Sequence, residues 1–175
     1  MGGLRILGGK AKGRRIRVPE SARPTPVRLR KALFDYLRSR YPVPGSFLDL
    51  YAGSGAVGLE AASEGWRATL VERDPAAVRL LAENVRATGL PARVVNQPVA
   101  RFLRRAAARG ETYDVAFMAP PYPDDLAAAF AELLESGVVR PGGLAILQHP
   151  VELSLPYGDR RVYGKNAFTA VVVES

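Results

Sequence analysis

The stretch Asp49-Leu50-Tyr51-Ala52-Gly53-Ser54-Gly55-Ala56-Val57-Gly58-Leu59-Glu60 decides the fold of this 175-residue chain. It follows an apolar run, 47–50, that predicts a buried strand, and it leads into an apolar segment, 57–64, that predicts a helix. Its three glycines have the spacing G-x-G-x-x-G between strand and helix. Missing Cβ atoms let such a turn lie against a nucleoside and let the helix pack closely on the sheet. The stretch therefore predicts a cofactor loop, although similar loops also hold NAD, FAD or nothing.

Strand and helix patterns alternate after this loop. Asp74-Pro75 is a strong helix start, since Asp caps a helix and Pro suits its first position, and Gly89 predicts the stop. The predicted strands are 47–50, 68–72, 93–96, 115–118, 144–148, 160–163 and 168–173, and the predicted helices are 57–64, 75–88, 99–108 and 126–134. The pattern predicts an α/β fold with a mainly parallel seven-stranded sheet covered on both faces. It ends in an antiparallel hairpin, because no helix separates the last two strands.

Glu72 ends the second predicted strand, 17 residues after Gly55 (72 − 55). A carboxylate there can accept hydrogen bonds from both ribose hydroxyls, so loop and acid together indicate an adenosine-containing cofactor. Asp49 distinguishes between the two candidate cofactors, a dinucleotide and S-adenosylmethionine. An acid here is unfavourable beside the pyrophosphate of a dinucleotide and favourable opposite the ammonium and sulfonium of S-adenosylmethionine. We therefore predict S-adenosylmethionine, with a nicotinamide oxidoreductase as the alternative.

The fourth predicted strand runs into Ala119-Pro120-Pro121-Tyr122. Two prolines make a rigid turn without backbone donors, and an aromatic side chain beside them can stack on a flat base. The carboxyl ends of parallel strands are where α/β proteins bind ligands. We predict this turn as the catalytic segment.

Positive charge is concentrated near the N-terminus of a chain whose net charge is +8. Residues 1–40 contain 12 Lys and Arg against two acids, a net of +10, which leaves 13 basic and 15 acidic residues, a net of −2, in 41–175. This segment is predicted to form a short basic hairpin, 4–7 with 14–18, and an amphipathic helix, 27–40. An evenly Arg-rich surface would not give such asymmetry, which indicates a nucleic-acid backbone as partner.

Length and composition predict a single domain, 1–175, made of an RNA-binding extension, 1–40, and a cofactor-binding core, 41–175. No apolar run approaches the ~18 residues of a membrane span, so we expect a cytoplasmic protein without a membrane partner. The absence of Cys excludes disulfides and thiol catalysis. We expect no metal site, and we interpret His149 as structural, Trp66 as packing between helix and sheet, and Asp124-Asp125 as a helix start.

Several motifs together resemble those of one family. They are Arg5-Ile6-Leu7-Gly8-Gly9, Lys12-Gly13-Arg14, Arg23-Pro24-Thr25, Arg28-Leu29-Arg30, Leu33-Phe34, the 49–60 loop, Val94-Val95-Asn96, Phe102-Leu103, the Pro-Pro-Tyr turn and Tyr163-Gly164-Lys165. Along nearly its whole length the chain resembles the RsmD family of bacterial 16S ribosomal RNA guanine-N2 methyltransferases. The N-terminal motifs are the specific part, whereas a much wider superfamily shares the glycine loop.

This resemblance implies a Rossmann-like three-layer sandwich. It also implies methyl transfer from S-adenosylmethionine to the exocyclic N2 of a guanine in 16S ribosomal RNA, within a partly assembled small subunit. We expect the protein to be a monomer. The catalytic segment would be Ala119, Pro120, Pro121 and Tyr122. The cofactor-binding residues would be Asp49, Tyr51, Ala52, Gly53, Ser54, Gly55, Glu72, Arg73, Gln97 and Pro98. The RNA-binding residues would be Lys10, Lys12, Arg14, Arg15, Arg23, Thr25, Arg28 and Arg30.

Two positions depart from the family pattern. Pro98 stands where such proteins often carry Asn or Asp toward the adenine amino group, which leaves adenine to the Gln97 side chain or to backbone contacts. Ala119 stands where the family has the Asp or Asn that accepts a hydrogen bond from the target amine. Two alternatives therefore stay open: a module that binds RNA and S-adenosylmethionine without transfer, and a methyltransferase for another nucleic-acid or protein amine.

Overall fold

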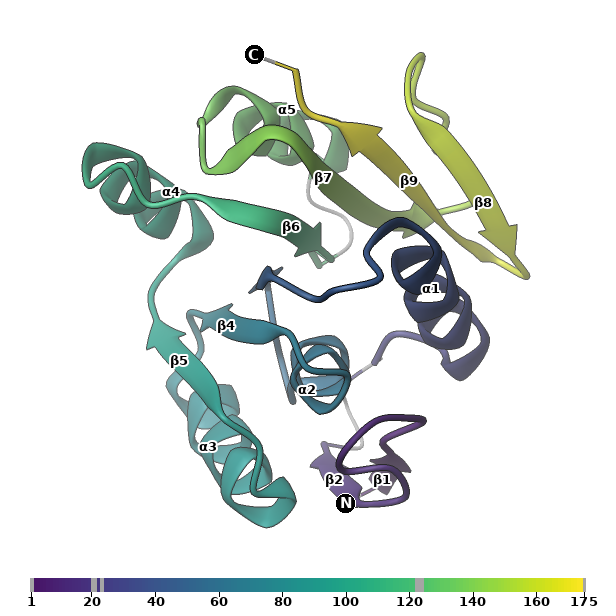
Figure 1. The fold of residues 1–175 in the computed structure, drawn as a ribbon, viewed down its shortest axis with the longest axis vertical. Helices are drawn as coiled ribbons and strands as arrows, with labels where there is room; N and C mark the ends of the chain where they lie inside the picture. The colour runs from purple at the N-terminus through teal and green to yellow at the C-terminus, as the bar shows by residue number, and fades with distance from the viewer. Residues whose placement is uncertain (1, 20–21, 23, 122–124, 175) are drawn as a thin grey trace.

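The computed structural model of the protein describes residues 2–19, 22, 24–121 and 125–174. In this part of the chain one large sheet has the strand order β5-β4-β3-β6-β7-β9-β8 (Figure 1). Neighbours among the first five are parallel, whereas β9 is antiparallel to both β7 and β8. The strands are β3 (Ser46–Leu50), β4 (Arg67–Glu72), β5 (Ala92–Asn96), β6 (Tyr113–Met118), β7 (Val139–Pro150), β8 (Asp159–Tyr163) and β9 (Asn166–Val172). The predicted seven-stranded sheet and its final hairpin are confirmed.

Helices cover both faces of the sheet, because successive strand residues point to opposite sides. Phe47 packs in a buried cluster with α1 and α2, whereas the next residue, Leu48, packs in a cluster with α4 and α5. The helices are α1 (Val27–Arg40), α2 (Ala56–Ser63), α3 (Pro75–Thr88), α4 (Val99–Ala108) and α5 (Leu126–Glu135). The result is the predicted three-layer sandwich. Among the described residues, no helix has the length and apolar character needed to cross a membrane.

The ends of α3 follow from local signals. Asp74 Oδ1 accepts a hydrogen bond from the Ala76 amide at 3.0 Å, Pro75 occupies the first turn, and Gly89 follows in the left-handed conformation at φ 67°. These are the predicted cap, start and stop. The largest boundary difference is in β7, which begins at Val139 rather than at residue 144. Its composition marks 141–143 as a loop, but this Pro-Gly-Gly segment continues the strand past an irregularity in the pairing with β6.

A separate antiparallel hairpin, β1 (Gly2–Arg5) and β2 (Arg15–Val18), packs on the helices rather than extending into solvent. Ile6 and Ile16 are buried in a cluster with Leu59 of α2. Gly9 has φ 78°, and a Cβ added there would lie 2.1 Å from the Ser63 carbonyl oxygen, so only glycine lets the turn approach α2 this closely. The predicted basic hairpin is confirmed, although its first strand covers 2–5 rather than 4–7. Its backbone is tied to the helix that follows the glycine loop, since the Lys10 amide donates to the Ser63 carbonyl.

Candidate functional site

The glycine loop leaves the carboxyl end of β3 through a strained turn. Tyr51 has φ 64°, an uncommon value for a residue with a side chain, and Gly53 and Gly55 have φ 58° and 93°. The Ala52 amide donates to the Val71 carbonyl at 2.9 Å, which fixes the loop to β4. A Cβ added at Gly53 would meet nothing within 4 Å, so this part of the loop has open space beside it. The turn therefore presents backbone to a ligand.

Glu72 lies at the end of β4 beside this turn, as predicted. Its Oε1 accepts from the Gly53 amide at 2.9 Å and its Oε2 accepts from the Asp74 amide at 2.9 Å. A carboxylate has about four acceptor sites, so two remain for other donors. Glu72 thus joins the glycine loop to the start of α3 and still offers acceptor capacity for ribose hydroxyls.

Asp49, predicted as a cofactor-binding residue, lies beneath the loop. The side chain is 2% exposed, and its Oδ2 accepts from the Gly58 amide at 2.8 Å. Close packing of α2 on the sheet causes this burial, since a Cβ at Gly58 would lie 2.5 Å from the Leu70 side chain. Burial raises the pKa of Asp49 to about 7, against the effect of the Gly58 hydrogen bond. Its charge can act on a ligand only through the loop.

The other predicted cofactor residues surround Glu72 on the same edge. The Gln97 amide donates to the Glu72 carbonyl at 3.1 Å, Pro98 is the cap residue of α4, and Arg73 is exposed. Asn96, the last residue of the Val94-Val95-Asn96 motif, was not predicted as a site residue; it donates through Nδ2 to the carbonyls of Glu72 and Arg73, both at 3.0 Å. Its amide therefore fixes the chain beside the candidate ribose acceptor.

Asn84 is a site-supporting residue that was not predicted. From α3, its Nδ2 donates to the Ser54 carbonyl in the glycine loop at 2.9 Å and to the Arg17 carbonyl in β2 at 3.0 Å. Its Oδ1 accepts from the Arg17 amide at 2.9 Å. One buried amide thus connects the loop to the basic hairpin.

The Pro-Pro turn lies directly beside the glycine loop. The Ala119 amide donates to the Leu50 carbonyl at 3.3 Å, which joins the ends of β6 and β3. Pro120 is buried and Pro121 is exposed. Tyr122 and Asp124 lie outside the described residues. Asp125 accepts from the Ala128 amide at 3.0 Å, which confirms it as the cap of α5.

Five of the predicted RNA-binding residues are on the surface. Lys10, Lys12, Arg14, Arg15 and Arg28 are exposed, and Arg14 donates to the Ala87 carbonyl at 3.3 Å. They come from the hairpin and from the start of α1.

Of the other three predicted RNA-binding residues, two are buried and one is not described. Arg23 lies outside the described residues. Thr25 is buried, and its hydroxyl donates to Gln148 Oε1 at 2.7 Å, so it is a structural contact rather than a surface group.

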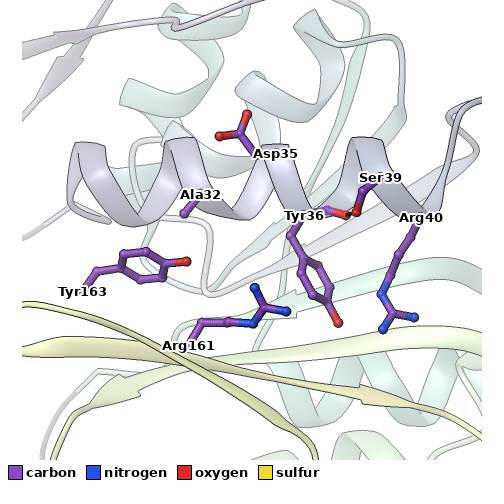
Figure 2. A pocket seen from close by; sticks show the side chains of 7 residues that line it. All are labelled: Ala32, Asp35, Tyr36, Ser39, Arg40, Arg161 and Tyr163. Carbon is purple, nitrogen blue, oxygen red and sulfur yellow. Dashed lines mark hydrogen bonds between the residues drawn. The ribbon is translucent and has the colours of Figure 1, made fainter.

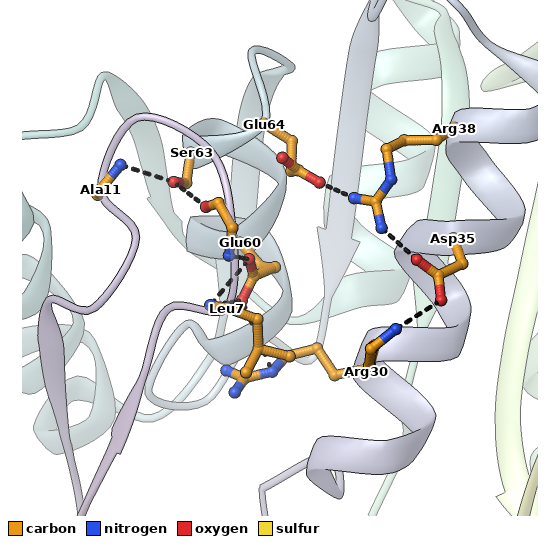
Figure 3. A network of polar contacts seen from close by, with 10 residues as sticks. Leu7, Ala11, Arg30, Asp35, Arg38, Glu60, Ser63 and Glu64 are labelled. Carbon is orange, nitrogen blue, oxygen red and sulfur yellow. Dashed lines mark hydrogen bonds and ion pairs between the residues drawn. The ribbon is translucent and has the colours of Figure 1, made fainter.

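Arg30 is the clearest correction to the predicted RNA-binding set. It is 1% exposed, its Nη2 donates to the Arg5 carbonyl at 2.8 Å, and its Nε lies 3.7 Å from Glu60 Oε1. Glu60 also accepts from the Leu7 and Gly8 amides. Figure 3 shows side chains of α2 reaching the hairpin on one side and α1 on the other. Arg30 therefore holds three elements together.

The remaining candidates are structural, as predicted. His149 is fully buried between the Thr169 hydroxyl and the Pro150 carbonyl, and burial lowers its pKa. Trp66 packs edge-on against Tyr41 and Phe47 between α2 and the sheet. Within the described residues, no group of three or more His, Cys, Asp or Glu side chains is placed to hold a metal ion.

Comparison with known proteins gives three findings. The family model described as conserved hypothetical protein 95 matches residues 4–168. Ribosomal RNA small subunit methyltransferase D of Escherichia coli K12 is 38% identical over 160 residues, covering 89% of this chain and 79% of that protein. The structure of a hypothetical protein from Thermus thermophilus is 70% identical, with a TM-score of 0.95 over 97% of this chain and 99% of that chain.

A more distant structure shares the fold. The Thermus thermophilus 16S rRNA N2 methyltransferase RsmC, solved with AdoMet and guanosine, is 22% identical, with a TM-score of 0.76 over 99% of this chain and 50% of that chain. At this identity the likeness supports the fold alone. The 38%-identical Escherichia coli relative is named as a methyltransferase, which argues against the nicotinamide oxidoreductase alternative.

Proposed function

The chain belongs to the conserved hypothetical protein 95 family, the RsmD family, and on this basis we propose that it methylates the exocyclic N2 of a guanine in 16S ribosomal RNA with S-adenosylmethionine. One observation carries the assignment to this edge of the sheet. The hydrogen bond between the Ala119 amide and the Leu50 carbonyl puts the Pro-Pro turn beside the glycine loop. A cofactor at the ends of β3 and β4 and a base at the end of β6 would then be neighbours.

The residues at this edge fit the cofactor. Glu72 would accept from the ribose hydroxyls, the open backbone at Gly53 would lie against the nucleoside, and Gln97 with its neighbours would face adenine. S-adenosylmethionine supplies an electrophilic methyl group carried by a sulfonium. Asp49 would act from beneath the loop, where its carboxylate attracts positive charge across a dry interior and holds the Gly58 amide. Tyr51, Ala52, Ser54, Gly55, Arg73 and Pro98 would shape the same surface.

The Pro-Pro turn would hold the target amine. A guanine N2 is barely basic because its lone pair is delocalised into the ring, so its alignment matters more than proton removal. Ala119 has no side-chain acceptor, and prolines have no amide donors, which leaves the carbonyls of Ala119 and Pro120 as acceptors for the amine. We assign the catalytic segment to Ala119, Pro120, Pro121 and Tyr122 on this basis.

The exposed basic residues would hold the RNA. Lys10, Lys12, Arg14, Arg15 and Arg28 lie on the hairpin and the start of α1, and Asn84 links that hairpin to the glycine loop. We propose that the protein acts as a monomer in the cytoplasm. Its substrate would be a partly assembled small subunit, with 1–40 as the RNA-binding part of one domain and 41–175 as the cofactor-binding part.

Methyl transfer from labelled S-adenosylmethionine tests this function. Small subunits and free 16S RNA, both lacking the modification, are incubated with the protein, and the label is located by nuclease mapping and mass spectrometry of nucleosides. We expect N2-methylguanine at one position, with subunits labelled faster than free RNA. Binding of both cofactor and subunits without any N2-methylguanine would instead support the module that lacks transfer, and label on another amine would redirect the assignment.

A further inference from the structure

An open cavity of about 590 Å³ lies between α1 and β8 (Figure 2). Its lining combines aromatic and basic side chains from segments more than a hundred residues apart in sequence. These residues are Ala32, Asp35, Tyr36, Ser39, Arg40, Arg161 and Tyr163. None of these residues belongs to the predicted cofactor-binding, catalytic or RNA-binding sets.

Two guanidinium groups flank one ring in this cavity. The Cζ atoms of Arg40 and Arg161 lie 4.9 and 5.2 Å from the centroid of the Tyr36 ring, and Figure 2 shows them on either side of it. Tyr36 is itself buried and packs edge-on against Phe168 at 5.6 Å. Cation–π contact with a fixed ring holds both guanidiniums at defined places. Because the ring stands between them, the two do not converge on a single anion.

The two segments that form the cavity, α1 and 159–165, are strongly basic. In α1 and 159–165 the exposed cations are Arg28, Lys31, Arg38, Arg40, Arg160, Arg161 and Lys165. Seven cations against Asp35 and Asp159 give a net charge of +5. Asp159 pairs with Arg161 at 3.0 Å, and Asp35 pairs with Lys31 and Arg38. The acids therefore position cations and leave the surface positive.

The end of β8 and the start of α1, which border the cavity, lie at the edge of the sheet that carries the Pro-Pro turn. β8 runs in the same direction as β7, because both are antiparallel to β9. Tyr163 at the end of β8 and Pro150 at the end of β7 both pair with Asn166. The Thr25 hydroxyl bonds to Gln148 in β7, which places the start of α1 at this edge as well.

We propose that this groove between α1 and β8 binds consecutive backbone phosphates of the RNA strand that flanks the target guanine, one at Arg40 and one at Arg161. The proposal rests on the proposed function, since it extends the RNA surface of the same enzyme. Guanidinium forks match phosphate oxygens, and a strand leaving the Pro-Pro turn along α1 would meet both.

Salt-dependent RNA binding tests the groove. The variants are Arg40→Gln, Arg161→Gln and the double variant, with Arg104→Gln/Arg109→Gln as the control, because these exposed arginines lie on and just after α4, a helix that covers the opposite face of the sheet. Fluorescence anisotropy with a small-subunit RNA fragment is measured from about 50 to 300 mM KCl. We expect the slope of log affinity against log salt to fall by about 0.7 per lost phosphate contact, so about 1.4 for the double variant. Cofactor affinity should stay unchanged.

Two further measurements make the outcome unambiguous. Arg40→Lys keeps the charge and should retain most of the slope that Arg40→Gln loses. If Arg40 had a purely structural role, the slope would not depend on the charge at this position. Thermal melting checks that each variant is folded. If the groove variants give the same slope as the α4 control, and the wild-type protein still methylates the RNA, the groove proposal is wrong and the proposed function stands. If the wild-type protein neither binds the RNA nor labels it, the proposed function itself fails and the groove fails with it.

Discussion

Arg30 Nε lies 3.7 Å from Glu60 Oε1, and the two side chains are 1% and 2% exposed. Glu60 also accepts from the Leu7 and Gly8 amides, so the pair joins α1, α2 and the hairpin (Figure 3). Burial raises the pKa of Glu60 and lowers that of Arg30, while each charge opposes the shift of the other. Two Arg30 nitrogens, Nε and Nη1, lack hydrogen-bond partners, so the carboxylate is the main compensation for this buried charge.

Removing Arg30 should therefore destabilise the fold. We expect Arg30→Ala to lower the free energy of unfolding by about 3 to 5 kcal/mol, because Glu60 is left as a buried, uncompensated charge. Urea denaturation measures the change. Arg28→Ala is the matched control, since Arg28 is exposed in the same helix turn and should change stability by less than about 0.5 kcal/mol. Equal stability of the two variants, with weaker RNA binding by Arg30→Ala, would return Arg30 to the RNA surface.

Neutralising the exposed arginines should weaken RNA binding without affecting the cofactor. The triple variant Arg14→Gln/Arg15→Gln/Arg28→Gln should reduce the slope of log affinity against log salt by about 2, at roughly 0.7 per phosphate contact. Fluorescence anisotropy over a salt series measures it. Three exposed arginines of α4 and its C-terminal end, Arg101, Arg104 and Arg109, serve as the control when changed together to Gln. A slope shared by both triple variants would mean that overall charge, not this surface, drives binding.

Glu72→Ala should weaken S-adenosylmethionine binding by about 1 to 3 kcal/mol, because the ribose acceptor is lost. The Gly53 and Asp74 amides lose their acceptor too, so part of the effect would come from a looser loop. Titration calorimetry gives the dissociation constant, and amide hydrogen exchange at Gly53 reports the loop. An unchanged dissociation constant would remove Glu72 from the site, and tight NAD binding by the wild-type protein would overturn the cofactor assignment.

Cofactor affinity should depend on pH through Asp49, whose pKa burial raises to about 7. Below this pH the free protein carries a neutral Asp49, and the cationic cofactor favours the ionised form. Affinity should thus rise by roughly tenfold from pH 6 to 7.5, with proton release on binding. Asp49→Asn keeps an acceptor for the Gly58 amide and should flatten this dependence in calorimetry. A steep pH dependence that persists in the Asn variant would assign it to another group.

The same raised pKa predicts how stability changes without cofactor. Between the ordinary pKa of 3.8 and about 7 the folded state binds the Asp49 proton and the unfolded state does not. The contribution of Asp49 to stability is therefore present at low pH and is lost as pH rises through this window. Asp49→Asn should remove this loss, which urea denaturation at pH 5 and pH 8 can detect.

Local signals explain why most of the fold could be predicted from sequence. The helices 27–40 and 99–108 begin and end at the predicted residues, because apolar spacing and the turn residues around them depend only on neighbours in the chain. The features that could not be predicted depend on partners that are distant in the sequence. Arg30 has Leu33, Phe34 and Leu37 three, four and seven residues later, which is the spacing of a buried stripe. The missing information was Glu60, a partner that only the folded chain brings beside it.

Asn84 illustrates the same limit for the site. It lies in α3 four residues from Leu80 and Thr88, so its burial follows from helical spacing. Its hydrogen bonds to Ser54 and Arg17 join segments that are 30 and 67 residues away in sequence. The ends of the strands were predictable as a site, because parallel sheets bind ligands there. The burial of Asp49 could not be predicted from the sequence, since it depends on how closely Gly58 lets α2 approach Leu70.

Ala119 stands where the expected family motif has Asp or Asn, and the fold gives a reason for expecting activity despite it. The Ala119 amide is fixed to the Leu50 carbonyl, so the turn has a defined position relative to the glycine loop. Alignment of a bound amine with an electrophilic methyl group can supply much of a rate enhancement without any proton transfer. Carbonyls held in a rigid Pro-Pro turn can provide that alignment.

The test of Ala119 is a single-turnover rate with RNA and cofactor both saturating, which separates the chemical step from binding. We expect the wild-type protein to transfer methyl groups to guanine N2, and Ala119→Asp to change the rate while leaving both dissociation constants within about threefold. Ala119→Ser is the matched control, because it adds a small hydroxyl at the same place without charge. A large gain with Asp but not with Ser would show that a carboxylate acceptor limits the native rate. A loss with both would show that the turn has no room beside Ala119, in keeping with its partly buried packing against the α1 cluster. Absence of N2-methylguanine from the wild-type protein and from both variants, with binding intact, would mean that the carbonyls do not orient the amine.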